Sequence, residues 1–198
     1  MPSVVVPFRG TEGKSRLARL PVEVRAELRE AMLADVLAAC EAVGATYLVT
    51  SAQRVRTSAT VVPDAGRGQG AAVVAGLDAA ARTGAAAAPF LVVNADLPCV
   101  TARDLLTLAG SIPDGGLALV EAADGTTNAL GLSSPERFEP VYGPGSAARF
   151  AALAPSRVLE VPNLVDDVDT VDDLGRLRGR VGPNTRRVLA RLRADAAA

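Results

Sequence analysis

The residues best able to support chemistry in this sequence are aspartates in two short segments. One segment is Asn-Ala-Asp-Leu-Pro at 94–98, which places Asp96 directly after an apolar run. The other holds Asp166, Asp167 and Asp169. A carboxylate at the tip of a buried strand lies where a magnesium ion and phosphates can reach it. We therefore expect Asp96 to bind a metal, and a cation to bridge it to the second acidic segment.

Each segment also has a purely structural interpretation. Asp96 could hydrogen-bond within its own turn as an Asx motif. Negative charge before a helix N-terminus is stabilising without any function, and Thr170 with Asp173 fits a capping box. Capping accounts well for Asp169 and Asp173. It accounts less well for the mutual repulsion of the two preceding aspartates, which a cation would relieve.

The chain contains no histidine. A histidine general base, a Ser-His-Asp triad, a Cys-His pair and a histidine zinc site are therefore excluded. Cys40 and Cys99 lie in apolar stretches without partner spacing and are interpreted as reduced core residues. Catalysis must then depend on carboxylates, lysine or arginine, backbone amides and an oxygen-ligated metal, which favours phosphate chemistry.

A loop of glycine and charge at 9–16 supplies the cationic groups such chemistry needs. Gly13 allows close approach of the backbone to a phosphate, while Lys14 and Arg16 carry charge that offsets a triphosphate. The loop matches neither a P-loop nor GxGxxG. An ordinary solvated loop between a strand and a helix is therefore an equal alternative.

Alternating strands and helices must position these loops. Strands are predicted at 3–8, 46–50, 59–62, 90–94, 117–121, 128–132 and 157–161. Helices are predicted at 22–43, 69–82, 101–108, 146–153, from 170 through 178, and at 184–193, with a linker at 84–88. This order indicates one α/β domain, residues 1–198, with a Rossmann-like, mixed and mainly parallel sheet. Ligands bind such sheets beyond the carboxyl ends of the strands, where the three loops should meet.

Composition limits the partners. The 198 residues carry 21 basic and 22 acidic side chains, a formal net charge of -1, so neither nucleic acid nor a membrane surface is expected as a partner. No apolar run approaches the ~20 residues of a membrane span, and no signal peptide is visible, so a cytoplasmic location is the default. The apolar excess leaves room for a homodimer.

Several motifs together resemble those of one enzyme family. They are Val-Pro-Phe-Arg at 6–9 with Lys-Ser-Arg-Leu at 14–17, Gly-Gln-Gly at 68–70, and Ala-Asp-Leu-Pro at 95–98. They continue in Gly-Thr-Thr-Asn-Ala-Leu at 125–130, Tyr-Gly-Pro-Gly-Ser at 142–146 and Asp-Val-Asp-Thr at 167–170. The chain resembles the 2-phospho-L-lactate or phosphoenolpyruvate guanylyltransferases of coenzyme F-420 biosynthesis. It is more distantly similar to the guanylyltransferase of molybdenum cofactor synthesis and to sugar-phosphate nucleotidyltransferases, which share a GT-A-like fold.

The resemblance implies a substrate set and a set of roles. GTP and a phosphorylated three-carbon acid would meet over Mg²⁺. Its ligands would be Asp96 and, from the second acidic segment, Asp169 or Asp167 or both. Gly68 and Gly70, with Gly13 and Lys14, would bind the nucleotide. Thr127, Gly143 and Ser146 would hold the phosphate and carboxylate of the acid.

Ser146 stands after a glycine at the start of a predicted helix. The free backbone amides and the helix dipole favour an anion there, which supports an anion site at Ser146. In the alternative interpretation Ser146 is merely an N-cap and Thr127 a turn residue. Family members often carry an aromatic residue and a histidine near this serine; here Phe150 ends the segment and histidine is absent. Arg67 and Gln69 stand where members vary, so the guanine-recognition residues stay open.

The implied reaction needs no general base. A phosphate monoester has its second pKa near ~6 and attacks the α-phosphorus as a dianion. Asp96, Lys14 and Arg16 are the predicted catalytic residues, because alignment and charge neutralisation are what two mutually repelling anions require.

Two other functions remain open at this point. One is a magnesium nucleotidyltransferase with a molybdopterin or sugar-phosphate acceptor. The scarcity of aromatic residues argues against the pterin, which would need a wider and more aromatic pocket. The other is a non-catalytic nucleotide-binding α/β domain. The alanine- and arginine-rich composition suggests a GC-rich, actinobacterium-like source. For such a source the family resemblance implies phosphoenolpyruvate as the acid, in preference to 2-phospho-L-lactate and 3-phosphoglycerate.

Overall fold

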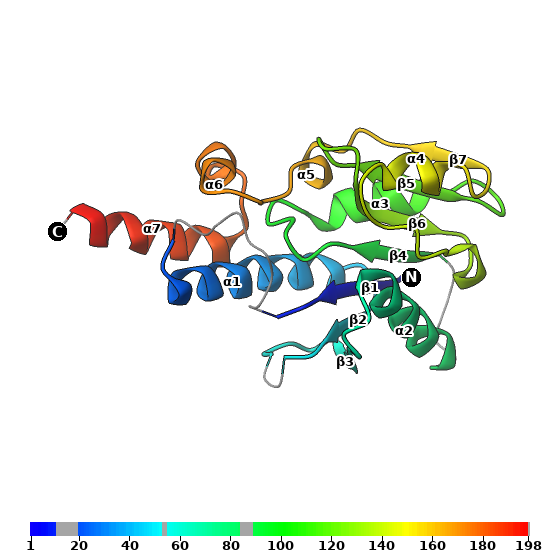
Figure 1. The fold of residues 1–198 in the computed structure, drawn as a ribbon, viewed down its shortest axis with the longest axis horizontal. Helices are drawn as coiled ribbons and strands as arrows, with labels where there is room; N and C mark the ends of the chain where they lie inside the picture. Colours follow the sequence, from blue (N-terminus) through cyan, green and yellow to red (C-terminus); the bar gives the residue numbers. More distant parts are fainter. Residues whose placement is uncertain (11–19, 53–54, 84–88, 198) are drawn as a thin grey trace.

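A computed structural model describes residues 1–10, 20–52, 55–83 and 89–197. Its centre is a seven-stranded sheet in the order β3-β2-β1-β4-β6-β5-β7, with helices packed on both faces (Figure 1). The strands are β1 (Ser3–Phe8), β2 (Ala45–Thr50), β3 (Thr60–Pro63), β4 (Phe90–Val93), β5 (Leu117–Glu121), β6 (Thr127–Leu132) and β7 (Ser156–Val158). The predicted mixed, mainly parallel α/β sheet is confirmed.

The helices are α1 (Val22–Glu41), α2 (Gln69–Arg82), α3 (Ala102–Gly110), α4 (Ser146–Ala151), α5 (Pro162–Val165), α6 (Val171–Leu177) and α7 (Pro183–Ala197), with a 3-10 turn at Pro135–Arg137. The prediction for α2 matches to the residue. A capping box formed by Thr101 and Asp104 begins α3. The predicted linker at 84–88 lies outside the described residues.

One strand reverses the sheet, and this reversal matters for the site. β6 is antiparallel to both β4 and β5, whereas every other pairing is parallel. The turn before β6 contains Gly125, whose φ of 80° is costly for residues with a side chain. Because β6 is reversed, its first residue, Thr127, lies at the same edge of the sheet as the carboxyl ends of its neighbours.

The five central strands are buried on both faces, which explains their continuous apolar sequences, whereas the edge strands β3 and β7 are mostly exposed. In β1, Val4 and Val6 pack under α1 and α3, while Val5 packs on the opposite face against α2. A third apolar cluster joins the N-terminal half of α1 to α6 and α7 and includes Cys99. Cys40 and Cys99 are both free and buried, as predicted.

Two predictions about the last third of the chain are corrected. The strand expected to run to residue 161 ends at Val158, and a short helix, α5, begins at Pro162. Proline lacks the N–H that a strand ladder needs but suits the first turn of a helix. α4 also ends at Ala151 rather than at residue 153. Among the described residues, no helix is long and apolar enough to cross a membrane.

Candidate active site

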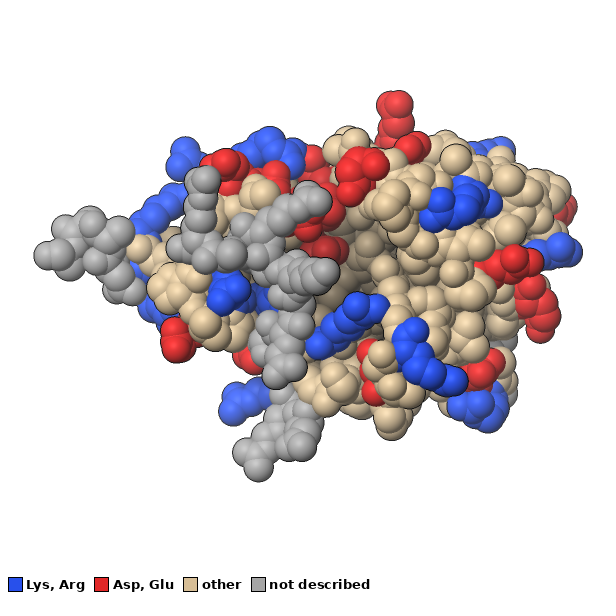
Figure 2. Space-filling model, in the orientation of Figure 1, with Lys and Arg blue, Asp and Glu red and all other residues tan. Residues whose placement is uncertain are grey.

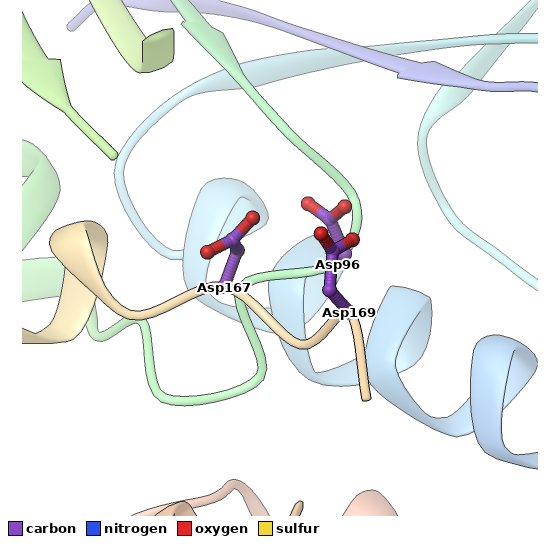
Figure 3. Close-up of side chains that lie close together, drawn as sticks. All are labelled: Asp96, Asp167 and Asp169. Carbon is purple, nitrogen blue, oxygen red and sulfur yellow. The ribbon is translucent and has the colours of Figure 1, made fainter. Parts of the chain in front are cut away.

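Three carboxylates converge at the carboxyl edge of the sheet. Asp96 lies in the loop after β4, and Asp167 and Asp169 lie between α5 and α6. Each offers an oxygen within 4.8 Å of the others (Figure 3). The Val168 N–H donates to the main-chain oxygen of Asp96 at 3.0 Å, which fastens the two loops together. The structure therefore brings the predicted ligands into one cluster, although α5 intervenes between β7 and the second acidic segment.

The cluster is electrostatically costly without a cation. Burial, and then the charge of Asp167, raises the pKa of Asp96 to about 7. Burial and the charge of Asp169 raise the pKa of Asp167 to about 6. Among the described residues Asp96 Oδ1 is buried without a hydrogen-bond partner. A buried acceptor atom without a donor, on a carboxylate that clusters with two others, has the chemistry of a ligand for a hard divalent cation.

An Asx turn does not explain Asp96. Such a turn needs the backbone N–H two residues on, and that position is Pro98, which has none. The structural interpretation does hold for Asp173, whose carboxylate forms the predicted capping box with Thr170 and also accepts from the Asp169 N–H at 3.2 Å. The carboxylate of Asp169, in contrast, belongs to the cluster.

Asp166 has a different role from its neighbour. Its carboxylate pairs with Arg176 and, at 2.7 Å, with Arg180, and these two guanidinium groups hold its pKa below the ordinary value despite partial burial. Arg180 also donates to the Pro162 carbonyl at 2.9 Å. These ion pairs relieve the repulsion expected within the acidic run and help to hold Asp167 on the opposite side, toward Asp96.

The residues predicted for the acid also meet. Thr127 opens β6 and Ser146 opens α4, and their buried hydroxyls lie 3.0 Å apart. The Ser146 N–H donates to the Gly143 carbonyl at 2.9 Å. Gly145, in the left-handed region with φ 69°, is the N-cap of α4, so the alternative of Ser146 as an N-cap is wrong. Thr127 is likewise a strand residue and not a turn residue.

Arg149 is a residue that sequence reasoning missed. Its guanidinium donates to the carbonyls of Val141, Tyr142 and Pro144, and so holds the loop that carries Gly143. Phe150, next to it, is fully buried and packs edge-on against Tyr142 with ring centroids 5.1 Å apart. Phe150 thus anchors α4 in the core, which is why its position next to the serine motif does not make it a ligand-binding residue.

Two asparagines were also missed, and both fix loops at this edge. Asn128 donates through Nδ2 to the carbonyls of Leu164 and Val165, at 3.0 Å each, which ties α5 to β6 just before the second acidic segment. Asn94 connects the start of α2 with Thr127. The only sequence signal for them was their place beside motif residues, because an asparagine's partners depend on which loops the fold brings together.

The predicted nucleotide loops are only partly described. Gly13, Lys14 and Arg16 lie outside the described residues. Gly68 has φ 103° and is the N-cap of α2, and this positive φ explains why a glycine stands there.

On the face shown in Figure 2, acidic side chains gather along one side of a central hollow and basic side chains lie on the other.

Gly70 is explained by packing. A Cβ at this position would lie 2.5 Å from the Pro140 Cβ. We expect Gly70→Ala to destabilise the fold by about 1–3 kcal/mol, because Pro140 belongs to the backbone that leads into the Gly143 loop and cannot simply rotate away. The measurement is urea unfolding. Gly175→Ala is the matched control: it faces open space within α6 and should be neutral or stabilising by up to about 1 kcal/mol. Equal stability of the two variants would contradict the packing account.

Comparison with known proteins agrees with this geometry. A model of the MobA-like NTP transferase domain matches residues 19–193. The chain is 38% identical over 191 residues to the phosphoenolpyruvate guanylyltransferase of Sphaerobacter thermophilus, covering 88% of this chain and 91% of that protein. It is 32% identical over 219 residues to the 3-phospho-D-glycerate guanylyltransferase of Phenylobacterium zucineum, covering 98% and 97%.

A solved structure shows the same fold. The 2-C-methyl-D-erythritol 4-phosphate cytidylyltransferase of Thermus thermophilus superposes with a TM-score of 0.61 at 15% identity, over 89% of this chain and 97% of that one. The domain match spans most of the chain, and the identity to the curated relatives extends over almost their whole length. The chain is a nucleotidyltransferase: it belongs to the MobA-like NTP transferase family and, within it, to the family of these guanylyltransferases.

Proposed function

We propose that this protein transfers GMP from GTP to the phosphate of phosphoenolpyruvate in coenzyme F-420 biosynthesis. A phosphate oxygen of the acid bonds to the α-phosphorus of GTP, the bond from that phosphorus to the β-phosphate oxygen breaks, and pyrophosphate leaves. The observation that carries the proposal is the convergence of Asp96, Asp167 and Asp169 at the sheet edge that also holds the Thr127 and Ser146 hydroxyls. The relatives named phosphoenolpyruvate guanylyltransferases support the choice of substrates.

Mg²⁺ is the proposed metal, held by Asp96, Asp167 and Asp169. Asp96, Asp167 and Asp169 offer carboxylate oxygens within 4.8 Å of one another, and Oδ1 of Asp96 is buried without a donor among the described residues. Both observations fit a hard cation that prefers oxygen ligands. When bound, Mg²⁺ supplies positive charge that offsets the phosphates and helps to orient them.

The protein's own groups bind and align the two anions. Lys14 and Arg16 are proposed to neutralise the triphosphate and the departing pyrophosphate. The hydroxyls of Thr127 and Ser146 carry one proton each, and the hydrogen bond between them uses one of these two protons. The other O–H can therefore donate to the acid. No side chain needs to accept a proton, since the attacking phosphate is already mainly dianionic above its second pKa of about 6. The absence of histidine is therefore compatible with this reaction.

We expect Ser146→Ala to raise the KM for phosphoenolpyruvate by about tenfold to a hundredfold with little change in the KM for GTP. The reason is that the hydroxyl binds only the acid, and a lost hydrogen bond to a charged group costs about 1.5–3 kcal/mol. Steady-state kinetics with each substrate varied in turn measures this. Ser111→Ala, at an exposed hydroxyl after α3, is the control. Equal weakening of both substrates would argue against the anion site.

Parallel assays with three acids test the acceptor. Wild-type protein, GTP and Mg²⁺ are incubated with phosphoenolpyruvate, 2-phospho-L-lactate or 3-phospho-D-glycerate, and pyrophosphate release is measured. The highest kcat/KM is expected with phosphoenolpyruvate. 3-Phospho-D-glycerate is the second candidate because one relative is named for it. Release only with a sugar phosphate or a molybdopterin, or no release at all, would contradict the proposal.

The proposed reaction also has an expected location and set of partners. The substrates are free metabolites, GTP and a small phosphorylated acid, and we place the reaction in the cytoplasm without a nucleic-acid or membrane partner. The near-balanced charge of the chain supports this. A homodimer stays a prediction.

A further inference from the structure

Hydrogen bonds connect four residues across the carboxyl edge of the sheet, and the connection passes through the main chain of one of them, Thr127. Gln69 Nε2, in the first residue of α2, donates to Asn94 Oδ1 at 2.8 Å. Asn94 Nδ2 donates to the Thr127 carbonyl at 3.1 Å. The Thr127 hydroxyl lies 3.0 Å from that of Ser146. We call these four residues the polar relay.

The direction of the polar relay is determined by one main-chain group. The Thr127 carbonyl can only accept, so the amide nitrogen of Asn94 must face it and the amide oxygen must face Gln69. Gln69 must then present its own nitrogen. Both atoms of the Asn94 amide are therefore used, and neither a carboxylate nor an apolar side chain can replace both bonds.

Asn94 is held firmly enough for a movement at the start of α2 to reach Thr127 through it. Its backbone N–H donates to the Asn128 carbonyl at 3.1 Å, extending the ladder between β4 and β6. Thr127 and Ser146 are buried, and the bonds of Asn94 are partly buried, where hydrogen bonds are stronger and less exchangeable with water. A shift of the α2 start therefore cannot occur without breaking a bond or moving Thr127.

The two ends of the polar relay lie at different predicted substrate sites. Gln69 stands between Gly68 and Gly70 of the predicted nucleotide loop, and the Thr127–Ser146 hydroxyl pair belongs to the predicted acid site. We propose that Asn94 is a positioning residue that couples the two: a nucleotide bound at the α2 start holds Gln69 and, through Asn94, orders the hydroxyls that receive the acid. This inference rests on the proposed function.

The coupling has a kinetic consequence. The ordering of the acid site is completed by the first substrate, so the second binds more tightly. Cutting the polar relay at Gln69 should therefore weaken binding of the acid, although residue 69 is not itself predicted to touch the acid. A residue that merely stabilised α2 would instead affect the nucleotide, or neither substrate.

A double-mutant cycle tests this, with the KM for phosphoenolpyruvate at saturating GTP as the main readout. Gln69→Met keeps the side chain's length and removes its donor, and Asn94→Ala removes both bonds. Each is expected to raise that KM about fivefold to tenfold, and the double variant no more than Asn94→Ala alone, because both cut the same path. Val74→Ala, exposed on α2 outside the polar relay, is the control and should behave as wild type.

The outcomes separate the two claims. An active wild type whose Gln69→Met variant changes only the KM for GTP overturns the coupling and leaves the proposed function intact. The coupling is also overturned if the KM increases of Gln69→Met and Asn94→Ala multiply in the double variant, because the two residues would then act independently. Wild-type protein that transfers no GMP to any of the three acids overturns the proposed function and the coupling with it. Should Asn94→Ala fail to fold, Gln69→Met combined with Ser146→Ala provides the cycle, again with a less-than-multiplicative rise expected.

Discussion

Asp96→Asn should lower kcat by at least about a thousandfold while the protein stays folded. The amide retains the shape of the carboxylate but loses the charge that would hold a divalent cation beside Asp167 and Asp169. The fold should survive because the main-chain oxygen of Asp96, not its side chain, bonds to Val168. Pyrophosphate release measures the activity, and circular dichroism checks the fold.

The matched control is Asp172→Asn, which removes an exposed carboxylate from the first turn of α6 without touching the cluster. It should retain near-normal turnover. Removing the buried negative charge should also stabilise the metal-free protein above about pH 7, since burial and the charge of Asp167 disfavour the ionised form of Asp96. Near-normal turnover of Asp96→Asn would contradict the metal assignment.

Mg²⁺ should raise the melting temperature much more at pH 8 than at pH 5.5. In the folded protein the pKa of Asp96 is about 7 and that of Asp167 about 6, against an ordinary value of 3.8. At pH 5.5 the cluster therefore retains protons that a cation must displace, whereas at pH 8 the carboxylates are free to bind it. Stabilisation by a ligand grows with its affinity for the folded state.

The metal-free protein should show the opposite trend. Raised pKa values mean that the folded state keeps protons that the unfolded chain has already lost between about pH 4 and 7. The free energy of unfolding therefore falls as the pH rises through that window, by on the order of 4 kcal/mol for a shift of the size seen at Asp96. Thermal unfolding with EDTA or Mg²⁺ at both pH values measures both effects. Equal Mg²⁺ shifts at the two pH values, or the same pH trend in Asp96→Asn, would contradict this account.

The sequence predicted the parts of the fold that local patterns determine. The valine-rich β1, the periodic α1 and the alanine-rich α2 all appear where expected, because apolar patterning and glycine boundaries determine such elements locally. β7 and α5 were predicted less well. A three-residue exposed strand and a four-residue helix carry almost no periodic signal, and their boundary depends on pairing with β5.

For the site, the sequence predicted which residues meet but not what holds them in place. Asp96 could be placed at this edge because it follows the end of β4, but Asp167 and Asp169 reach the same cluster only after the intervening helix α5. The reversal of β6, which brings Thr127 to that edge, becomes visible in its antiparallel pairing with β4 and β5. The partners of Asn94 and Arg149 are main-chain carbonyls and an amide from other loops, and no residue type in the sequence marks those contacts in advance.

Transfer of GMP to the phosphate of phosphoenolpyruvate changes the bonding of phosphorus atoms in both substrates. Phosphorus-31 NMR of wild-type protein with GTP, phosphoenolpyruvate and Mg²⁺ tests it directly, since it resolves each phosphorus species during turnover. The signals of GTP and phosphoenolpyruvate are expected to decline together. Pyrophosphate and the product, an unsymmetrical diphosphodiester with a pair of coupled resonances, are expected to grow in equal amounts. Conversion of GTP to GDP and inorganic phosphate, or GTP loss with the phosphoenolpyruvate signal unchanged, would contradict the proposed transfer.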